Sequence, residues 1–455
     1  QFTQATLGDM AADIDAAVTA ARGALDGDWG RSTAAERADV IDRLYALFLE
    51  RSDDLANLIT AEVGSPLLFS HFGQVGATGM ALDYFAKLTR SFAFEEVRDG
   101  MMGPALVRHE PVGVCAGIVP WNVPLFISML KLAPALAGGS TIVLKPAPET
   151  PLSANALAQM CIDAGVPDGV VNIVPAGRET GQHLVTHPDV DKVSFTGSTA
   201  AGRKIGAACG ELLRRCTLEL GGKSAAIICD DADLDAIMPE LIAASTMNNG
   251  QACVAQTRIL ATRSRYDEVV EALTEAVAAI PVGDPANMET GCGPLIAERQ
   301  RERVEGYIQA GRDEGARVTT GGGRPEGLDR GWFVEPTVFA DVDNSMRIAQ
   351  EEIFGPVLAV IAVDDADDAV RVANDSAYGL SGTVWTADAD AGLDIARKVR
   401  TGTYTVNGFA MEWGAPFGGF KDSGVGRELG PEGLAAYLES KTINLPAGTE
   451  PTLAY

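Results

Sequence analysis

Apolar residues recur every three or four positions through the first hundred residues, with charged residues between them. This spacing places the apolar side chains on one face of a helix, and it predicts helices over residues 12–25 and within residues 34–64. Residues 94–110 break the pattern, because short β-prone runs flank a glycine-rich turn there. We interpret that segment as a β-hairpin.

From Val112 onward, short apolar runs alternate with amphipathic segments. Candidate strands lie at 113–120, 140–147, 169–176, 191–197 and 215–222, and a second series lies at 224–230, 257–262, 356–363, 382–386 and 402–408. Helical patterns separate the strands, for example at 264–278 and 294–313. Because apolar strands joined by helices form parallel sheets covered on both faces, the two series predict two α/β domains.

Composition narrows the class of protein. The chain has 455 residues, of which 46% are hydrophobic and 22% charged, as is typical of a soluble globular protein with two or three domains. Its formal net charge of −26 opposes binding to nucleic acid or to an anionic membrane surface. The sequence shows no apolar run of about 18 residues and no signal-peptide pattern near its start. We therefore expect a cytoplasmic protein with no nucleic-acid or membrane partner.

The cysteines raise the question of a reactive thiol. Seven occur, at positions 115, 161, 209, 216, 229, 253 and 292, without a C-x-x-C pair or a Cys/His cluster of metal-binding spacing, which predicts reduced thiols and no metal site. Cys253 follows Asn-Asn-Gly-Gln. Since an unperturbed thiol is mostly protonated at neutral pH, a catalytic cysteine needs a base, a positive neighbour or a helix N-terminus. The four histidines all precede the second domain, which disfavours a Cys/His pair without excluding it.

Two other polar residues suit a reaction at a cysteine. Glu219 ends the run RCTLE and precedes two glycines that let another segment or a ligand approach closely. A carboxylate at a strand end in an apolar setting can act as a base, although a surface or capping carboxylate fits the same pattern. Asn122 lies between Pro120 and Pro124. A rigidly held amide of this kind is a suitable donor to an oxyanion.

A candidate nucleotide site lies in SFTGSTAAGRKIG, where a β-type run ends at Thr196 and a helix begins behind Gly197 and Ser198, with Gly202 further on. The glycine spacing differs from that of the usual dinucleotide turn, and no P-loop signature follows. A helix N-terminus suits a pyrophosphate, but glycines that merely allow a tight turn explain the same residues. Lys145 ends the run TIVLK, where open parallel sheets bind ligands, yet it also fits a solvated lysine.

Seven motifs follow one another along nearly the whole chain. They are PWNVP (120–124), LKPA (144–147), FTGSTAAG (195–202), ELGGKS (219–224), NNGQAC (248–253), EEIFGPV (351–357) and APFGGFKDSGVGRELG (415–430). In this order they resemble the signatures of the NAD(P)-dependent aldehyde dehydrogenase superfamily. The resemblance implies a Rossmann-like cofactor domain over 1–92 and 112–221, a catalytic α/β domain over 222–425, and a small β oligomerisation element from 93–111 and 435–455. It also implies a homodimer or homotetramer, and first β-strands that precede Gln1.

The resemblance also implies a role for each matching residue. Cys253 would attack the aldehyde, Asn122 would hold the oxyanion, and Glu219 would activate the water that hydrolyses the thioester. NAD or NADP would be bound by Ile118, Pro120, Trp121, Lys145, Ala147, Pro148, Gly177, Gly181, Phe195, Gly197, Ser198, Gly202, Leu220, Gly221, Glu352 and Phe354. Among these, Glu352 at the nicotinamide ribose would also count as catalytic. The aldehyde tunnel would be lined by Val123, Ile127, Leu130, Met247, Ala252, Val254, Met411, Trp413 and Phe417.

One departure from the family pattern concerns the cofactor. NAD-preferring members usually carry a glutamate three residues after the lysine, whereas this sequence has Pro148 there and Glu149 one place later, so both dinucleotides stay open. The apolar tunnel, with no arginine before Lys131, favours neutral aliphatic or aromatic aldehydes over semialdehydes. Two alternative classes also stay open. One is a CoA-acylating relative, which Glu219 disfavours, and the other is a non-catalytic, crystallin-like protein of the same fold.

Overall fold

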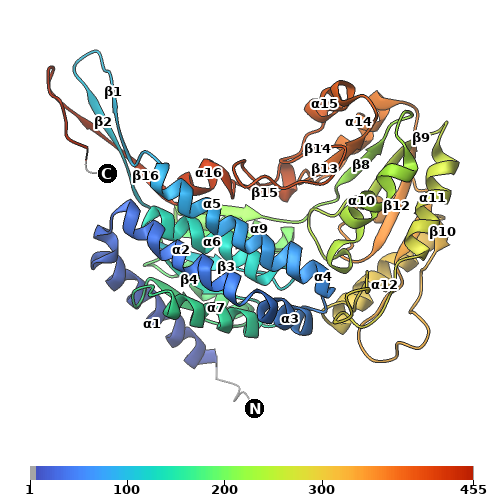
Figure 1. The fold of residues 1–455 in the computed structure, drawn as a ribbon, viewed down its shortest axis with the longest axis horizontal. Coiled ribbons are helices and arrows are strands. Elements are labelled where there is room, and N and C mark those ends of the chain that lie inside the picture. The colour runs from blue at the N-terminus through green and yellow to red at the C-terminus, as the bar shows by residue number, and fades with distance from the viewer. Residues whose placement is uncertain (1–6, 454–455) are drawn as a thin grey trace.

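The structure is a computed structural model that describes residues 7–453 of the chain (Figure 1). It contains three β-sheets, two of which are covered by helices on both faces. The predicted class, two α/β units with a small β element, is confirmed. The outer ends of the predicted ranges 1–92 and 435–455 lie outside the described residues.

The first unit is built on a six-stranded sheet of order β15-β7-β6-β3-β4-β5, parallel except for β15. Its strands are β3 (Val114–Ile118), β4 (Thr141–Lys145), β5 (Val171–Ile173), β6 (Lys192–Thr196), β7 (Arg215–Glu219) and β15 (Gly424–Val425). Every residue of β3, β4 and β6 is buried, as continuous apolar runs require of a sheet covered on both faces.

Helices cover both faces of this first sheet. One face is covered by α2 (Ala34–Glu50), α3 (Ser52–Val63), α5 (Ala77–Ser91), α6 (Pro124–Gly138) and α7 (Pro151–Asp163), and the other by α1 (Leu7–Asp26), α8 (Arg178–Thr186) and α9 (Thr199–Glu211). Shorter elements are η1 (Trp29–Arg31), α4 (Leu67–Phe69), the π-helical turn η2 (Ser70–Gly76) and α16 (Gly430–Ala435). The single amphipathic stretch predicted within 34–64 is divided into α2 and α3 at Arg51, whose backbone angles depart from helical values.

The second unit is built on a seven-stranded sheet of order β10-β11-β12-β9-β8-β13-β14, parallel except for β10. Its strands are β8 (Ala225–Ile228), β9 (Arg258–Thr262), β10 (Arg317–Thr320), β11 (Thr337–Ala340), β12 (Val357–Val363), β13 (Gly382–Trp385) and β14 (Thr405–Val406). Helices α10 (Leu234–Thr246) and α11 (Tyr266–Ala278) cover one face. The other face is covered by α12 (Glu298–Asp313), α13 (Arg347–Gln350), α14 (Ala366–Asn374) and α15 (Ala389–Lys398). Two 3-10 turns, η3 (Met247–Gly250) and η4 (Lys421–Ser423), complete the described elements.

The third sheet is an antiparallel arm of β1 (Glu95–Arg98), β2 (Ala105–Pro111) and β16 (Leu438–Asn444), which projects from the first unit at the upper left of Figure 1. The hairpin predicted over 94–110 is therefore confirmed. Strands β10 and β11 had no counterpart among the predicted strands. β10 is largely polar and so lacks an apolar run, and β11 is a buried run of four residues that was missed. Strand β15 pairs with β7, so the last two residues of the predicted range 222–425 belong to the first sheet.

Candidate active site

The strand ends of the first sheet and the strand starts of the second meet at one place. Ile118 pairs with Lys145 and Phe195, and Thr196 pairs with Glu219, so these residues share the carboxyl edge of the first sheet. The loop carrying Cys253 lies just before β9, at the amino edge of the second sheet. Because parallel strands bring the ends of distant segments together, this junction gathers most of the residues predicted to be functional.

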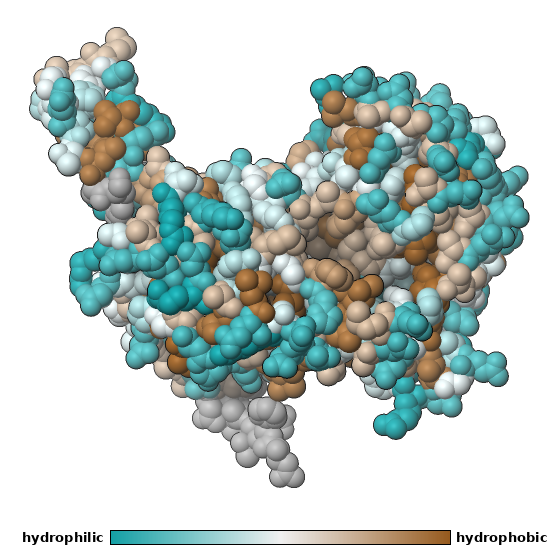
Figure 2. All heavy atoms as spheres, viewed as in Figure 1, coloured by the Kyte–Doolittle hydropathy of each residue, from teal (hydrophilic) through white to brown (hydrophobic). Residues whose placement is uncertain are grey.

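A cavity of about 550 Å³ opens at this junction. Cys253, Asn122 and Glu219 all line it, together with every residue predicted for an aldehyde tunnel: Val123, Ile127, Leu130, Met247, Ala252, Val254, Met411, Trp413 and Phe417. Figure 2 shows hydrophobic residues gathered in the hollow between the arm and the right-hand lobe. Among the described residues, those that line the cavity include no lysine, arginine or histidine, and the charged ones are Glu219, Glu240 and Glu428.

Several aromatic residues of the cavity wall were missed by the sequence analysis. They are Phe69, Phe72, Phe126 and Phe409. Phe69 and Phe72 come from the segment around the π-helical turn η2, whose wider turn does not follow the 3.6-residue periodicity used to predict helices. A Cβ at Gly73 would lie 2.5 Å from the Phe69 ring, so a glycine is required where that ring packs.

The loop before Cys253 makes a sharp turn through η3. Asn248 and Asn249 adopt left-handed backbone angles, with φ of 53° and 61°, which asparagine tolerates better than most residues. Gly250 also has a positive φ, of 71°, and a Cβ there would lie 2.2 Å from the Gly355 carbonyl group. The sequence Asn-Asn-Gly therefore provides the turn that brings Cys253 to the cavity.

Asn122 is fixed against this loop by two hydrogen bonds. Its Nδ2 donates to the Gln251 carbonyl at 2.8 Å, and Asn248 Nδ2 donates to the Asn122 carbonyl at 2.9 Å. The residue is 3% exposed. An amide nitrogen carries two hydrogens, so one remains for a ligand in the cavity. The geometry suits a preorganised donor to an oxyanion.

The electrostatic environment of Cys253 is unfavourable to a thiolate. Burial raises the pKa of the Cys253 thiol to about 12, with smaller contributions from the carboxylates of Glu352 and Glu219. In the protein alone the thiol is therefore protonated at neutral pH. It becomes a nucleophile only when a base removes its proton or a cation binds beside it.

Glu219 ends β7 and is 3% exposed. Burial and the neighbouring Glu428 carboxylate raise its pKa well above the ordinary value, whereas Lys131 and Arg427 act in the opposite direction. Within the described part of the chain, neither of its carboxyl oxygens has a hydrogen-bond partner. A buried carboxylate with free lone pairs and a raised pKa is suited to general-base work near neutral pH.

A buried ion pair lies next to Glu219. Lys131 Nζ donates to Thr196 Oγ1 at 2.7 Å and lies 2.8 Å from Glu428 Oε1, and the two charged side chains are 0% and 2% exposed. Thr196, Glu219 and Glu428 all line the cavity. Neither Lys131 nor Glu428 was among the predicted functional residues. A lone lysine in the otherwise apolar helix α6 was the available signal, because a lysine there must be buried with a partner.

The carboxyl edge of the first sheet carries the residues predicted to hold the adenosine end of a dinucleotide. Lys145 Nζ donates to the carbonyls of Pro146 at 2.7 Å and Ala176 at 2.8 Å, and burial lowers its pKa to about 8. A Cβ at Gly181 would lie 3.2 Å from the Lys145 side chain, whereas one at Gly177 would meet nothing within 4 Å. Gly177 therefore borders open space beside the lysine. Ile118 and Ala147 are buried next to these residues, and Pro120 is half-buried.

The turn between β6 and α9 matches a pyrophosphate-binding helix start. Ser198 caps α9 by accepting a hydrogen bond from the Ala201 N–H at 3.3 Å. A Cβ at Gly197 would lie 2.6 Å from the Phe195 ring, and one at Gly202 would lie 2.4 Å from Leu220. Both glycines thus permit close packing, and the first turn of α9 keeps N–H groups that can bind an anion. The geometry therefore agrees both with a pyrophosphate-binding site and with glycines that only allow a tight turn.

Glu352 and Phe354 lie on the opposite side of the cleft. The Gly222 N–H donates to Glu352 Oε1 at 2.9 Å, and a Cβ at Gly221 would lie 2.6 Å from Oε2. Burial raises the pKa of Glu352. The Phe354 ring contacts Trp121 edge-on, with centroids 5.4 Å apart. Two residues missed by the sequence analysis hold this loop, since Gln300 Nε2 donates to the Phe354 carbonyl at 2.7 Å and Arg303 Nε to the Ile353 carbonyl at 3.1 Å.

The structure shows where the residues lie that depart from the family pattern after Lys145. Pro148 is exposed, and the Glu149 carboxylate forms an ion pair with Arg299 of α12, in the second unit. Position 148 therefore offers no carboxylate to a ribose. An open space beside Gly177, a lysine at a strand end, a capped helix start and a buried carboxylate across the cleft together fit a dinucleotide.

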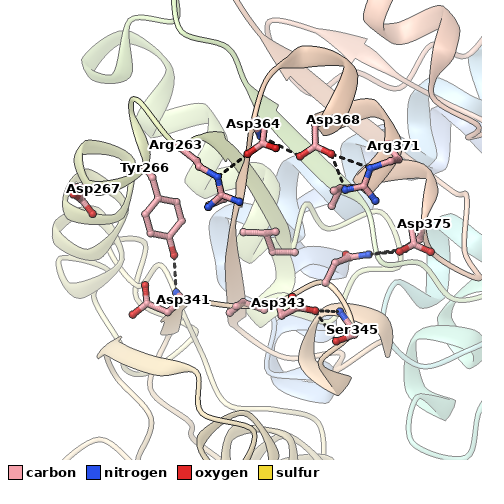
Figure 3. A pocket seen from close by; sticks show the side chains of 15 residues that line it. Arg263, Tyr266, Asp267, Asp341, Asp343, Ser345, Asp364, Asp368, Arg371 and Asp375 are labelled. Atoms are coloured by element: carbon pink, nitrogen blue, oxygen red, sulfur yellow. Dashed lines mark hydrogen bonds and ion pairs between the residues drawn. The ribbon is translucent and has the colours of Figure 1, made fainter.

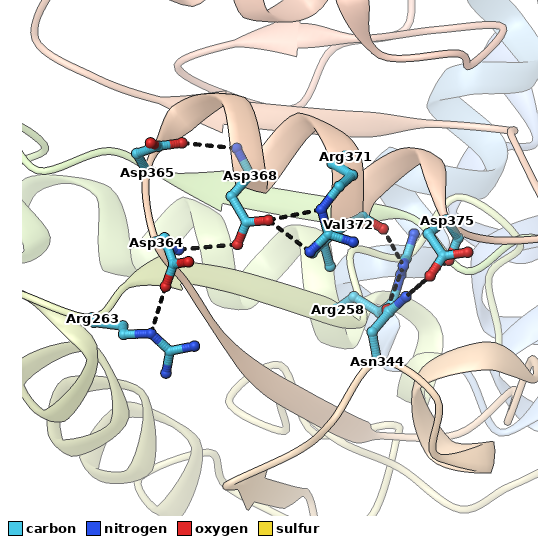
Figure 4. Close-up of polar contacts among 9 residues, drawn as sticks. All are labelled: Arg258, Arg263, Asn344, Asp364, Asp365, Asp368, Arg371, Val372 and Asp375. Carbon is cyan, nitrogen blue, oxygen red and sulfur yellow. Dashed lines mark hydrogen bonds and ion pairs between the residues drawn. The ribbon is translucent and has the colours of Figure 1, made fainter.

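A second cavity, of about 670 Å³, lies at the carboxyl ends of β9, β11 and β12 (Figure 3). It is polar, and six of the fifteen residues that line it are aspartates. Arg263 is paired with Asp364 and Arg371 with Asp368, at 2.6 Å each (Figure 4). The lining of the cavity has no cysteine or histidine, and the hydroxyl of its Ser345 donates to the Asp343 carboxylate of the same loop. Over residues 7–453, no group of His, Cys, Asp and Glu is arranged to hold a metal ion, and no helix is long and apolar enough to span a membrane.

Comparison with known proteins agrees with this geometry. A model of the aldehyde dehydrogenase family matches residues 2–443. A geranial dehydrogenase from Castellaniella defragrans is 49% identical over 435 residues, which cover 95% of this chain and 91% of the relative.

Two solved structures show the same fold. An aldehyde dehydrogenase from Mycobacterium tuberculosis, complexed with NAD+, has a TM-score of 0.96 at 53% identity, with 97% of this chain and 92% of that chain covered. A cysteine-to-alanine mutant of aldehyde dehydrogenase C from Pseudomonas syringae, complexed with NAD+ and octanal, has a TM-score of 0.93 at 42% identity, with 97% and 90% covered.

Proposed function

The chain belongs to the aldehyde dehydrogenase family, and from that premise we propose that it oxidises neutral aliphatic or aromatic aldehydes to carboxylic acids with NAD or NADP. The observation that carries this proposal is the convergence of Cys253, Asn122 and Glu219 on one apolar cavity beside the strand-end cleft. Reduction of NAD(P) by a panel of aldehydes, with and without CoA, tests it. A CoA-acylating enzyme needs CoA for turnover, and a non-catalytic protein reduces neither cofactor.

The reaction follows from the positions of the three side chains. Cys253 Sγ attacks the aldehyde carbon after losing its proton to a neighbouring carboxylate, and Asn122 Nδ2 with the Cys253 backbone N–H donates to the oxyanion. NAD(P), when bound in the strand-end cleft, would supply the hydride acceptor for oxidation of the thiohemiacetal to a thioester. Glu219 then takes a proton from the water that attacks the thioester, and the carboxylic acid leaves while Cys253 recovers its proton.

The charges of Lys131 and Glu428 change the pKa of Glu219, which gives a prediction on the pH dependence of kcat. Turnover needs ionised Glu219, so kcat falls as pH drops through the pKa of that residue. Lys131 lowers this pKa and Glu428 raises it. We expect the acid limb of kcat to move to higher pH in Lys131→Met and to lower pH in Glu428→Gln, each by about one unit. Measuring the pH of half-maximal kcat checks both, and shifts of the same sign in the two variants would contradict the assignment.

The lining of the cavity supports a neutral substrate. Its walls are apolar, and the charges at its surface are all acidic. A substrate carboxylate would therefore be buried without a cationic partner, which costs several kcal/mol, whereas each buried methylene contributes about 0.8 kcal/mol of affinity. Relatives named for geranial and complexed with octanal agree with this class.

The substrate prediction follows directly. We expect hexanal to exceed succinate semialdehyde in kcat/KM by about a hundredfold or more, because the buried carboxylate is left unpaired. Octanal should match or exceed hexanal, since its added methylenes lie in the same apolar cavity. Steady-state kinetics with the three aldehydes at saturating cofactor measures both ratios. A higher kcat/KM for succinate semialdehyde than for hexanal would overturn the proposal of a neutral substrate.

The cofactor prediction concerns position 148. Pro148 neither accepts a hydrogen bond from a ribose 2′-hydroxyl nor repels a 2′-phosphate, so we expect the enzyme to accept NADP as well as NAD. In Pro148→Glu the ratio of kcat/KM should shift toward NAD, by about tenfold for one charge-assisted hydrogen bond gained and one repulsion added. A wild type that rejects NADP outright would contradict the argument.

We also propose a cytoplasmic homodimer or homotetramer. All seven cysteines are unpaired, which supports a reducing compartment. The arm exposes Val97, Met101, Met102 and Ile443, which supports burial of its apolar surface against another copy of the chain. Light scattering of the purified protein distinguishes monomer, dimer and tetramer.

A further inference from the structure

An ion pair joins the two units beside the cofactor cleft. Glu149 lies in the loop after β4, four residues beyond Lys145, and Arg299 lies in the first turn of α12. The Arg299 guanidinium is 2.5 Å from Glu149 Oε1, and the two side chains are 56% and 23% exposed. A cation from the second unit is thus held over the loop that follows the candidate ribose lysine.

The residues around this loop differ in how well they can bind a phosphate. Lys145 Nζ already donates to two carbonyls, so only one of its three N–H groups remains for a phosphate. Pro148 contributes neither a donor nor a carboxylate. The forked N–H groups of the Arg299 guanidinium match a phosphate as well as a carboxylate.

The start of α12 adds to the positive potential at Arg299. The N-cap residue is Ala297, whose side chain cannot accept from the free N–H groups of the first turn. Those groups and the helix dipole favour an anion nearby. Two carboxylates oppose it, Glu149 itself and Glu298, and Glu298 is paired with Arg301 at 3.5 Å.

We propose that Arg299, which is paired with Glu149 in the free protein, recognises the 2′-phosphate of NADP, so that the cleft has a site for 2′-phosphorylated adenine nucleotides. The inference rests on the proposed binding of a dinucleotide in this cleft. An exposed ion pair contributes little stability, so the guanidinium can exchange Glu149 for a phosphate at small cost. With a plain 2′-hydroxyl present, the pair with Glu149 stays intact and Arg299 adds nothing to affinity.

The alternative is that Arg299 and Glu149 only hold the two units together. In that case Arg299→Gln would weaken every adenine nucleotide to the same extent, since it would loosen the whole cleft. If Arg299 binds the phosphate, Arg299→Gln should lower the affinity only for nucleotides that carry a 2′-phosphate.

Titration calorimetry with 2′,5′-ADP and with ADP separates the two, and it needs neither an aldehyde nor turnover. We expect wild type to bind 2′,5′-ADP at least as tightly as ADP. In Arg299→Gln the affinity for 2′,5′-ADP should fall by about tenfold or more, with ADP changed by less than about twofold. Glu149→Gln removes the competing carboxylate and should strengthen 2′,5′-ADP binding several-fold.

The matched control is Arg263→Gln, which removes another exposed arginine of the second unit that is paired with a carboxylate. Arg263 lines the second cavity, at the carboxyl edge of the second sheet, whereas the Cys253 loop lies at the amino edge. It should leave both affinities unchanged. An unchanged affinity for 2′,5′-ADP in Arg299→Gln, or an equal loss for both nucleotides, would overturn the proposal. Aldehyde-dependent reduction of NAD+ by the wild-type protein tests the proposed function separately, since it does not depend on a 2′-phosphate.

Discussion

Cys253→Ala is expected to abolish aldehyde oxidation. The variant keeps the cavity and the strand-end cleft but has no atom that can form the thiohemiacetal, so even a single turnover should fail. Loss of a catalytic nucleophile typically lowers kcat by about 10⁵-fold or more. Rapid mixing of the variant with hexanal and NAD+ should give no stoichiometric release of NADH, whereas wild type should give at least one equivalent per active site.

The control for this variant is Cys229→Ala. Cys229 is also a partly buried thiol of the second unit, but it does not line the cavity. Its replacement should leave kcat within about twofold of wild type, as expected for a small side chain away from the reaction. Residual oxidation by Cys253→Ala at more than a few per cent of the wild-type rate would show that another group is the nucleophile.

Glu219→Gln separates the two half-reactions. The amide keeps the size and polarity of the side chain but cannot take a proton from water, and loss of a general base typically slows a step by about 10² to 10⁴-fold. If Glu219 acts only in hydrolysis, a stoichiometric burst of NAD(P)H should be followed by a slow steady rate. A thioester on Cys253 should then accumulate and be visible by mass spectrometry.

The high pKa of Cys253 refines this prediction. Because Glu219 lines the same cavity as Cys253 and its carboxylate helps to raise the pKa of the thiol, Glu219 can also help to remove the proton of the thiol. In that case the burst itself becomes slower. Glu240→Gln is the matched control, since Glu240 lines the same cavity but does not perturb the thiol. Near wild-type turnover in Glu219→Gln without an accumulated adduct would show that another group activates the water.

The sequence predicted those candidate site residues that lie at the ends of strands. Lys145, Thr196 and Glu219 each close a short apolar run, and parallel strands bring such ends to one edge whatever their distance along the chain. Local patterns of this kind predicted both the fold class and the place of the candidate site. Asn248, Asn249 and Gly250 form a sharp turn before Cys253 that was not predicted, although asparagine and glycine tolerate the positive φ of that turn better than other residues.

The parts that were missed depend on contacts between distant segments. Lys131 and Glu428 are 297 positions apart, and Glu149 and Arg299 are 150 apart, so neither pair leaves a periodic signal. Phe69 and Phe72 reach the cavity through a π-helical turn that interrupts the usual helical spacing. Strand β10 is short and polar because it lies at the edge of its sheet. For the two ion pairs, the sequence shows the charged residues but does not show which residue each one contacts.

The stoichiometry of aldehyde oxidation tests most directly whether Glu219 hydrolyses a thioester on Cys253. Purified protein should be mixed with hexanal and NAD+ in the absence of CoA, and NADH and hexanoic acid should be measured in the same sample. We predict one hexanoic acid for each NADH over many turnovers, with no change when CoA is added. Turnover that requires CoA and yields hexanoyl-CoA, or the absence of any NADH with a panel of neutral aldehydes, would contradict the proposal that Glu219 hydrolyses a thioester on Cys253.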